Sequence, residues 1–246
     1  MFTKIKISKH IIEVKEYETL SLANQDNVSL TDYGESDNYE SNYLLTVKRR
    51  CETVRDLAIM NFDVDTAKFL TLTFRDTDDF DIRSVQDCAL EFQKFIKRLR
   101  YYYPNIKYLA VVEFQDKNDR GAVHYHVLIQ LPYVPMDKLY QIWSHGWIFI
   151  NKINHVDNIG AYVTKYMTKD NADIRLQKVK GYYCSQGLAR PYILKSWDLA
   201  SNYERMRYFQ ALDEIHQLQE SGKGCYYKTL NTDHGIIKYT QYNTKR

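Results

Sequence analysis

The order of periodic segments between residues 69 and 169 constrains the fold more than any other feature of this sequence. Alternating apolar and polar residues predict strands over 69–74, 108–114, 121–129 and 147–150, and helical periodicity predicts helices over 84–102, 137–145 and 158–169. The resulting split β-α-β-β-α-β order is typical of ferredoxin/RRM-like α+β folds. We therefore expect an antiparallel sheet with the helices against one face and a functional site on the other.

Local signals mark the ends of the predicted helices. Ser84, followed three residues later by Asp87, gives a capping-box-like start, and Pro104 follows the end of the same helix. Gly146 suits the C-terminal cap of the second helix. Asp157 suits the N-terminal cap of the third.

The flanking segments suggest an extension on either side of a core. We expect an N-terminal extension over 1–65, a core over 66–192 and a C-terminal extension over 193–246. The first extension would contain a strand or hairpin over 3–20, a polar linker over 21–41 and a basic helix over 42–61. The last would contain a helix over 199–220 and a hairpin over 225–240.

Charge is distributed unevenly along the chain. The 34 basic and 31 acidic residues give a net charge of only +3. Residues 1–40 hold four basic and eight acidic residues, so the remainder holds 30 and 23, a net charge of +7. A moderately basic body with an acidic N-terminal segment is compatible with a polyanionic partner, although ordinary solubility explains this charge equally well.

The cysteines and the apolar runs bound the cellular setting. The four cysteines are scattered with no Cys-x-x-Cys pair, which favours a reducing compartment without a structural zinc. Lysines interrupt the N-terminus where a signal peptide would need an apolar run, and no apolar run approaches a membrane span. We therefore expect a soluble, cytoplasmic protein with no membrane partner.

A His-x-His pair lies in the central predicted strand. Side chains on a strand alternate between faces, so His124 and His126 point to one side and Tyr125 points into the core. If the hairpin register places Glu113 on the same face, two imidazoles and one carboxylate meet there. These ligands leave coordination positions free, which suits Mg²⁺ or Mn²⁺ and does not exclude zinc. Taken alone, solvated histidines and a surface carboxylate explain the same residues.

The predicted helix over 158–169 carries a second set of reactive side chains. Tyr162 and Tyr166 are four residues apart, so they share a helix face that Lys165 borders. A tyrosine can attack a phosphodiester when its phenolate develops against a metal-polarised phosphate, and a nearby lysine can stabilise the charge. Most tyrosine pairs at this spacing are packing residues, but the combination with the histidine pair is harder to explain by packing.

Three segments, in this order, resemble the motifs of the HUH endonucleases, the rolling-circle replication initiators: Phe69–Phe74, His124-Tyr125-His126 and Tyr162–Tyr166. The two-tyrosine pattern is similar to that of gene A-type initiators of single-stranded DNA phages. The overall layout looks closer to gene II-like replication proteins of phages and plasmids, in which a segment resembling residues 182–191 follows the tyrosine helix. The resemblance covers about residues 66–192.

The resemblance implies a site- and strand-specific DNA nicking-joining endonuclease that initiates rolling-circle replication of a phage or plasmid. Tyrosine would attach to the 5′-phosphate and leave a free 3′-OH, with Tyr162 as first nucleophile, Tyr166 as second and Lys165 assisting. His124, His126 and Glu113 would hold Mg²⁺ or Mn²⁺.

The resemblance also implies partners. The substrate would be single-stranded or hairpin origin DNA, which we expect Thr71, Thr73, Arg75 and Lys169 to contact. The sequence has no Walker A motif, so a separate host helicase and a polymerase are implied. Two alternatives stay open: a non-catalytic RRM-like protein that binds single-stranded nucleic acid, and an HUH transposase or relaxase with the same chemistry.

Overall fold

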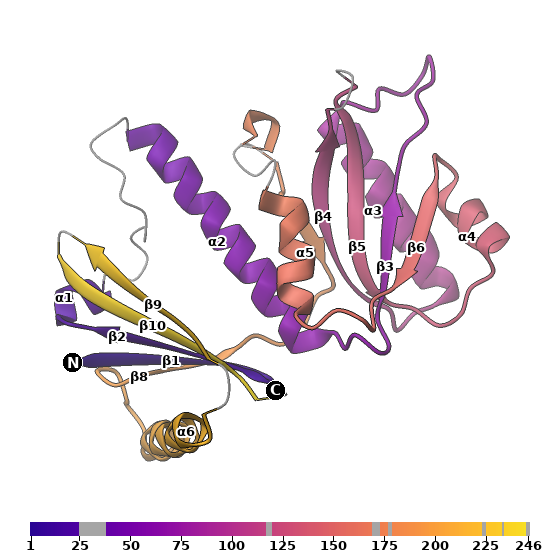
Figure 1. The fold of residues 1–246 in the computed structure, drawn as a ribbon. Coiled ribbons are helices and arrows are strands. Elements are labelled where there is room, and N and C mark those ends of the chain that lie inside the picture. The colour runs from indigo at the N-terminus through magenta and orange to yellow at the C-terminus, as the bar shows by residue number, and fades with distance from the viewer. Residues whose placement is uncertain are drawn as a thin grey trace. The chain divides into compact units, whose positions relative to one another are not determined.

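The chain forms two units, each with its own five-stranded sheet (Figure 1). The computed structural model describes residues 1–24, 38–116, 120–168, 173–176, 179–222, 225–232 and 234–244. The larger unit is Asn42–Ala189, and the smaller unit combines Met1–Ser41 with Arg190–Arg246. This division differs from the three consecutive segments expected from sequence, because strands from both ends of the chain share one sheet.

The larger unit contains every element predicted between residues 69 and 169. Its elements, with α2 beginning just before the boundary, are α2 (Asn38–Asn61), β3 (Lys68–Leu72), α3 (Val85–Tyr102), β4 (Lys107–Gln115), β5 (Ala122–Gln130), α4 (Met136–Trp143), β6 (Ile148–Lys152), α5 (Ile159–Thr168), a 3₁₀ turn (Ile174–Leu176) and β7 (Tyr182–Cys184). The sheet order is β6-β3-β5-β4-β7, with every neighbouring pair antiparallel. The predicted α+β class and antiparallel sheet are confirmed.

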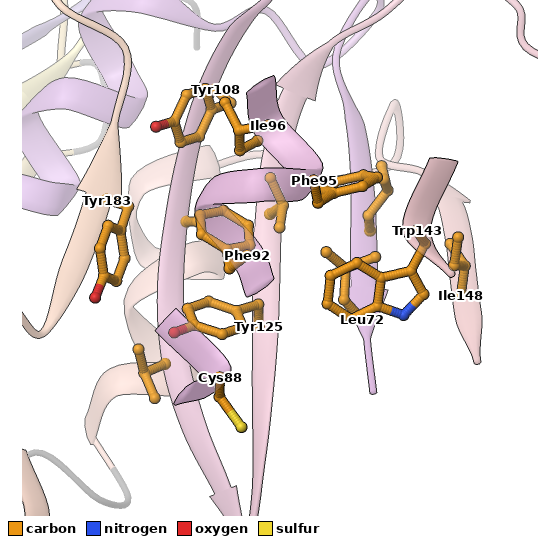
Figure 2. Packing of buried hydrophobic residues seen from close by; sticks show 14 of the residues in the cluster. Leu72, Cys88, Phe92, Phe95, Ile96, Tyr108, Tyr125, Trp143, Ile148 and Tyr183 are labelled. Atoms are coloured by element: carbon orange, nitrogen blue, oxygen red, sulfur yellow. The ribbon is translucent and has the colours of Figure 1, made fainter. Parts of the chain in front are cut away.

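Helices α3 and α4 cover one face of this sheet. Leu70 and Leu72 of β3 and Tyr125 of β5 belong to the same buried cluster as Phe92 of α3 and Trp143 of α4. Figure 2 shows the ring of Tyr125 against that of Phe92, with centroids 4.3 Å apart and planes 11° from parallel. The prediction that Tyr125 points into the core is therefore confirmed.

Helix α5 lies against the opposite face, so the expectation that all helices share one face does not hold. Phe69 alternates with Leu70 along β3, and its ring contacts those of Tyr162 and Tyr166 at 5.0 and 5.1 Å. Val163 of α5 is fully buried. This face carries apolar residues of β4 and β5 that also need covering, which the alternation pattern alone does not reveal.

Two of the predicted helix starts can be checked directly. The Ser84 hydroxyl accepts a hydrogen bond from the Asp87 backbone N–H at 3.3 Å, which confirms the cap of α3. The prediction for α5 is wrong by one residue, since the side chain of Asn158, not Asp157, accepts from the Ala161 N–H at 3.0 Å. Asparagine and aspartate both cap helices well, so adjacent candidates are hard to separate from sequence.

Gly146 is not the cap of α4. That position is Ser144, in the left-handed region with φ 60°. A Cβ atom at Gly146 would lie 2.6 Å from both the carbonyl oxygen and the hydroxyl of Thr73. The missing side chain lets the backbone cross Thr73 closely, and the next N–H, from Trp147, donates to the Thr73 hydroxyl at 2.7 Å.

We expect Gly146→Ala to destabilise the protein by about 1–3 kcal/mol, because the added methyl must displace backbone. The measurement is urea unfolding followed by circular dichroism. Gly181→Ala is the matched control, since a Cβ there first meets the Arg50 guanidinium at 3.1 Å, which can move aside. Equal stability losses for the two variants would contradict the close crossing at Thr73.

The smaller unit joins the two ends of the chain. Its elements are β1 (Phe2–Ser8), β2 (Ile11–Tyr17), α1 (Leu20–Asn24), β8 (Tyr192–Lys195), α6 (Asn202–Glu220), β9 (Cys225–Thr232) and β10 (Gly235–Asn243). The predicted N-terminal hairpin, C-terminal helix and C-terminal hairpin are confirmed. The sheet order β8-β1-β2-β10-β9 pairs the two hairpins with each other through β2 and β10, which was not predicted.

The four cysteines are all free thiols, in line with their scattered spacing. Within the described ranges, no helix combines the length and the apolar character needed to cross a membrane.

Candidate active site

The hairpin of β4 and β5 brings Glu113 to the histidine pair. The register places Glu113 directly opposite His124, and the residue opposite His126 is two positions earlier on the same strand. All three side chains therefore share one face. His126 Nε2 lies 2.6 Å from Glu113 Oε2, and His126 Nδ1 lies 3.1 Å from the Thr71 hydroxyl.

Both histidines are largely removed from solvent. His126 is 4% exposed and His124 is 9% exposed. Burial lowers the pKa of His124 to about 4, and the neighbouring His126 contributes in the same direction. The His124 imidazole is therefore neutral near pH 7, the form in which histidine binds a metal.

The donor types fit a divalent cation, but the side chains are not gathered around a common point. Among the residues with described placement, no three His, Cys, Asp or Glu side chains form a group that could hold a metal ion. His126 Nε2 instead bonds directly to Glu113. The Thr71 hydroxyl can donate or accept, so it supports either tautomer of His126, including the one that frees Nε2 for a metal.

Helix α5 places its tyrosines beside this pair. The ring of Tyr166 stacks on His126 with centroids 3.9 Å apart. Tyr162, one turn earlier, lies 6.0 Å from Tyr166 between ring centroids. Lys165 Nζ lies 4.0 Å from the centre of the Tyr162 ring and 4.8 Å from that of Tyr166. The predicted Tyr-x-x-Lys-Tyr cluster is thus assembled next to His126.

The electrostatics of the tyrosines disfavour a resting phenolate. Burial raises the pKa of Tyr162, and its hydrogen bond with Tyr166 acts in the same direction. Lys165 acts against these effects, because its positive charge favours the phenolate. A nucleophilic Tyr162 therefore needs its proton removed as the reaction proceeds, with Lys165 placed to stabilise the charge.

The residues predicted to contact DNA lie in different settings. Thr71 bonds His126, and Thr73 receives the N–H of Trp147, so both hydroxyls have partners within the protein. Arg75 follows β3 and is exposed. Lys169 lies outside the described residues.

Two aromatic residues that the sequence reasoning did not select share the face of the candidate site. Phe149 of β6 lies directly opposite Thr71, which in turn lies opposite His126. Phe149 is 55% exposed, and Trp147, two residues earlier, is 68% exposed. The signal was present: Ile148 and Ile150 alternate with two aromatics on an edge strand.

The fold and these contacts define an α+β unit with a histidine–carboxylate pair and a tyrosine helix on one sheet face. Residues 67–171 match the family described as replication-associated protein ORF2/gene II protein. The matched region begins just before β3 and extends past the end of α5, so it contains the whole candidate site. The match supports a role in DNA replication. A comparison with curated proteins found no match.

Proposed function

We propose that the larger unit is a DNA nicking-joining endonuclease of the HUH type that initiates rolling-circle replication of a phage or plasmid. The contact that carries the proposal is the stacking of Tyr166 on His126, whose Nε2 bonds Glu113. A tyrosine nucleophile, a lysine and three metal-ligand types are thereby brought to one sheet face. The match to replication-associated proteins over the same residues supports the proposal.

The proposed reaction is a transesterification. The Oη atom of Tyr162 or Tyr166 attacks phosphorus, the new O–P bond forms, and the bond from phosphorus to the 3′ oxygen breaks. The phenol loses its proton, and the leaving 3′ oxygen gains one to become a free 3′-OH. The downstream strand stays attached to tyrosine through its 5′-phosphate, and reversal with a new 3′-OH joins strands. A second tyrosine allows a second cleavage before the first link is released.

The chain's own residues divide the remaining tasks. Lys165, close to both rings, stabilises the developing phenolate and the phosphate charge. His124, His126 and Glu113 would hold Mg²⁺ or Mn²⁺, with Glu113 and His126 exchanging their direct bond for a shared ion. The ion supplies Lewis-acid polarisation of the scissile phosphate when bound.

The proposed substrate is single-stranded or hairpin origin DNA lying across the β6-β3-β5-β4 face. The sheet order would correspond to a ferredoxin/RRM-like split β-α-β fold with one added strand, β7. Unwinding and synthesis would come from a separate host helicase and polymerase. Arg75, together with Lys169 beyond the described α5, would contribute backbone contacts.

The proposal is tested with a random-sequence single-stranded DNA pool, because the origin sequence is unknown. The pool is labelled at the 3′ end in one sample and at the 5′ end in another, incubated with Mn²⁺, and resolved on a denaturing gel. A covalent adduct that carries only the 3′ label and disappears with EDTA is expected. An adduct that carries the 5′ label would contradict attachment to the 5′-phosphate.

We expect Phe149→Ala to weaken binding of single-stranded DNA by about tenfold, since loss of one stacking side chain costs about 1–3 kcal/mol per base. The measurement is fluorescence anisotropy with a labelled oligonucleotide. Tyr133→Ala is the matched control, because Tyr133 is 85% exposed but lies outside the sheet, in the segment before α4. Equal losses for both variants would remove β6 from the binding surface.

A further inference from the structure

The sheet of the smaller unit carries a row of lysines that the sequence scatters over more than two hundred residues. Lys4 of β1 lies directly opposite Lys195 of β8 on one side and Lys15 of β2 on the other. Lys15 lies opposite Tyr239 of β10, which lies opposite Lys228 of β9. Directly opposed residues point to the same face. These five residues, here called the lysine row, therefore cross all five strands in register.

The lysine row is on the face that α6 does not cover. Ile5, Val14 and Leu194 alternate with Lys4, Lys15 and Lys195, and they are buried in one cluster with residues of α6. Figure 1 shows α6 along one side of this sheet. The lysines point to the other side, where Lys228 is exposed and the others are half-buried.

Carboxylates on this face do not balance the charge. Glu13 lies in the next row, where it forms an ion pair with Lys6 at 2.6 Å. Glu16 lies opposite Thr3, so it alternates onto the α6 face. Within the five paired strands, the face thus carries five lysines and one carboxylate that is already paired with one of them.

The arrangement is unfavourable for folding alone. Like charges directly opposite one another in antiparallel strands are destabilising, and Lys4 has a lysine on each side. A sheet that tolerates this repulsion in register across its full width is explained by an anionic ligand that relieves it.

We propose that the lysine row binds the phosphate backbone of duplex DNA. Neighbouring strands are about 4.8 Å apart, so five strands span about 19 Å. This exceeds the ~12 Å width of the major groove, so the row can contact phosphates on both sides of a groove. Lysine contacts phosphate as a point charge without reading sequence.

The chemistry of the row favours duplex over single-stranded DNA. Single strands are held by aromatic side chains on which successive bases stack. The lysine row contains one aromatic residue, Tyr239, whose hydroxyl donates to Glu13. The smaller unit would therefore hold duplex beside an origin, a task separate from strand cleavage in the larger unit.

The test uses the full chain and a short fluorescent duplex of arbitrary sequence, with affinity measured by anisotropy over a series of KCl concentrations. The variant is Lys4→Gln, Lys15→Gln, Lys228→Gln, which leaves the Lys6–Glu13 pair intact. The charge-matched control is Lys97→Gln, Lys107→Gln, Lys238→Gln. Lys97 and Lys107 belong to the larger unit, and Lys238 lies opposite Thr229 in the set that alternates with the row.

We expect the row variant to bind duplex at least about tenfold more weakly near 0.1 M salt, with a slope of log affinity against log salt smaller by about 2.7, or 0.9 for each lost phosphate contact. The control should stay close to wild type. The thermal midpoint of the row variant should not fall, because opposed like charges are removed.

Two results would overturn the proposal. One is an equal loss of duplex binding in the row variant and the control, which would assign binding to overall charge. The other is unchanged duplex binding while the row variant loses binding to vesicles that contain anionic lipid, which would assign the face to a membrane surface. Neither result depends on nicking, so the proposed endonuclease stands or falls separately.

Discussion

Replacing both Tyr162 and Tyr166 with phenylalanine is expected to reduce the covalent DNA adduct by at least about a thousandfold, since either hydroxyl can serve as nucleophile and their effects are not additive. Phenylalanine keeps the ring contacts with Phe69 and His126 that hold α5 on the sheet. The loss would therefore report the missing hydroxyls and not a displaced helix. The measurement is the yield of the 3′-labelled adduct on a denaturing gel.

The control for this variant is Tyr101→Phe, Tyr102→Phe. These tyrosines are adjacent on the exposed side of α3, away from the candidate site, and their rings also contact each other at 5.1 Å between centroids. The control should form adduct at the wild-type level. A double Tyr162/Tyr166 variant that still forms adduct would show that neither residue is the nucleophile.

Replacing His126 with alanine is the second change with a large expected effect. It removes an imidazole that bonds Glu113 and Thr71 and stacks on Tyr166. We expect Mn²⁺ affinity to fall by more than the about 10- to 100-fold that loss of an outer-shell partner costs, and nicking to fall with it. Isothermal titration with Mn²⁺ measures the binding separately from activity.

The chain offers a close control for His126. His145 Nε2 lies 3.0 Å from Glu91 Oε2, so His145→Ala also removes a histidine from a histidine–glutamate pair. His145 contacts Phe74, Phe80 and Trp143 on the α3–α4 side of the sheet, and its loss should leave Mn²⁺ binding unchanged. Equal Mn²⁺ affinities of wild type and His126→Ala would contradict the proposed metal site.

The local elements of the fold follow from the sequence because their signals are local. Alternation in β3 and β5 and the Ser84 cap of α3 depend on residues within one turn or one strand, and all appear in the structure. The position of Tyr125 in the core follows from the same alternation. The hairpin register that brings Glu113 to the histidines was a condition in the sequence argument, and the pairing of β4 with β5 meets it.

Long-range pairing could not be predicted in the same way. Nothing near Lys4 indicates that its neighbours are Lys15 and Lys195, because the second pairing joins strands from opposite ends of the chain. Composition pointed the other way, since residues 1–40 contain twice as many acidic as basic residues. The face that a strand presents, and not the net charge of the segment, determines what it can bind.

The side of the sheet taken by α5 was also beyond the sequence. Amphipathic periodicity shows that Val163 and Met167 are buried, but not against which surface. The structure answers this with Phe69, which presents its ring to both tyrosines. Tyr166, ranked second from the resemblance, has the closer ring contact with His126, so the order of the two tyrosines stays a prediction.

The most direct test of the proposed nicking chemistry is to locate the DNA-linked residue by mass spectrometry. Trypsin cleaves after Lys152, Lys165 and Lys169, so it separates Tyr162, in the peptide 153–165, from Tyr166, in the peptide 166–169. After nuclease trimming of the adduct, we expect a nucleotide attached through its 5′-phosphate to one of these two peptides, and the peptide identifies which tyrosine attacks first. A nucleotide attached to any other peptide would contradict the account.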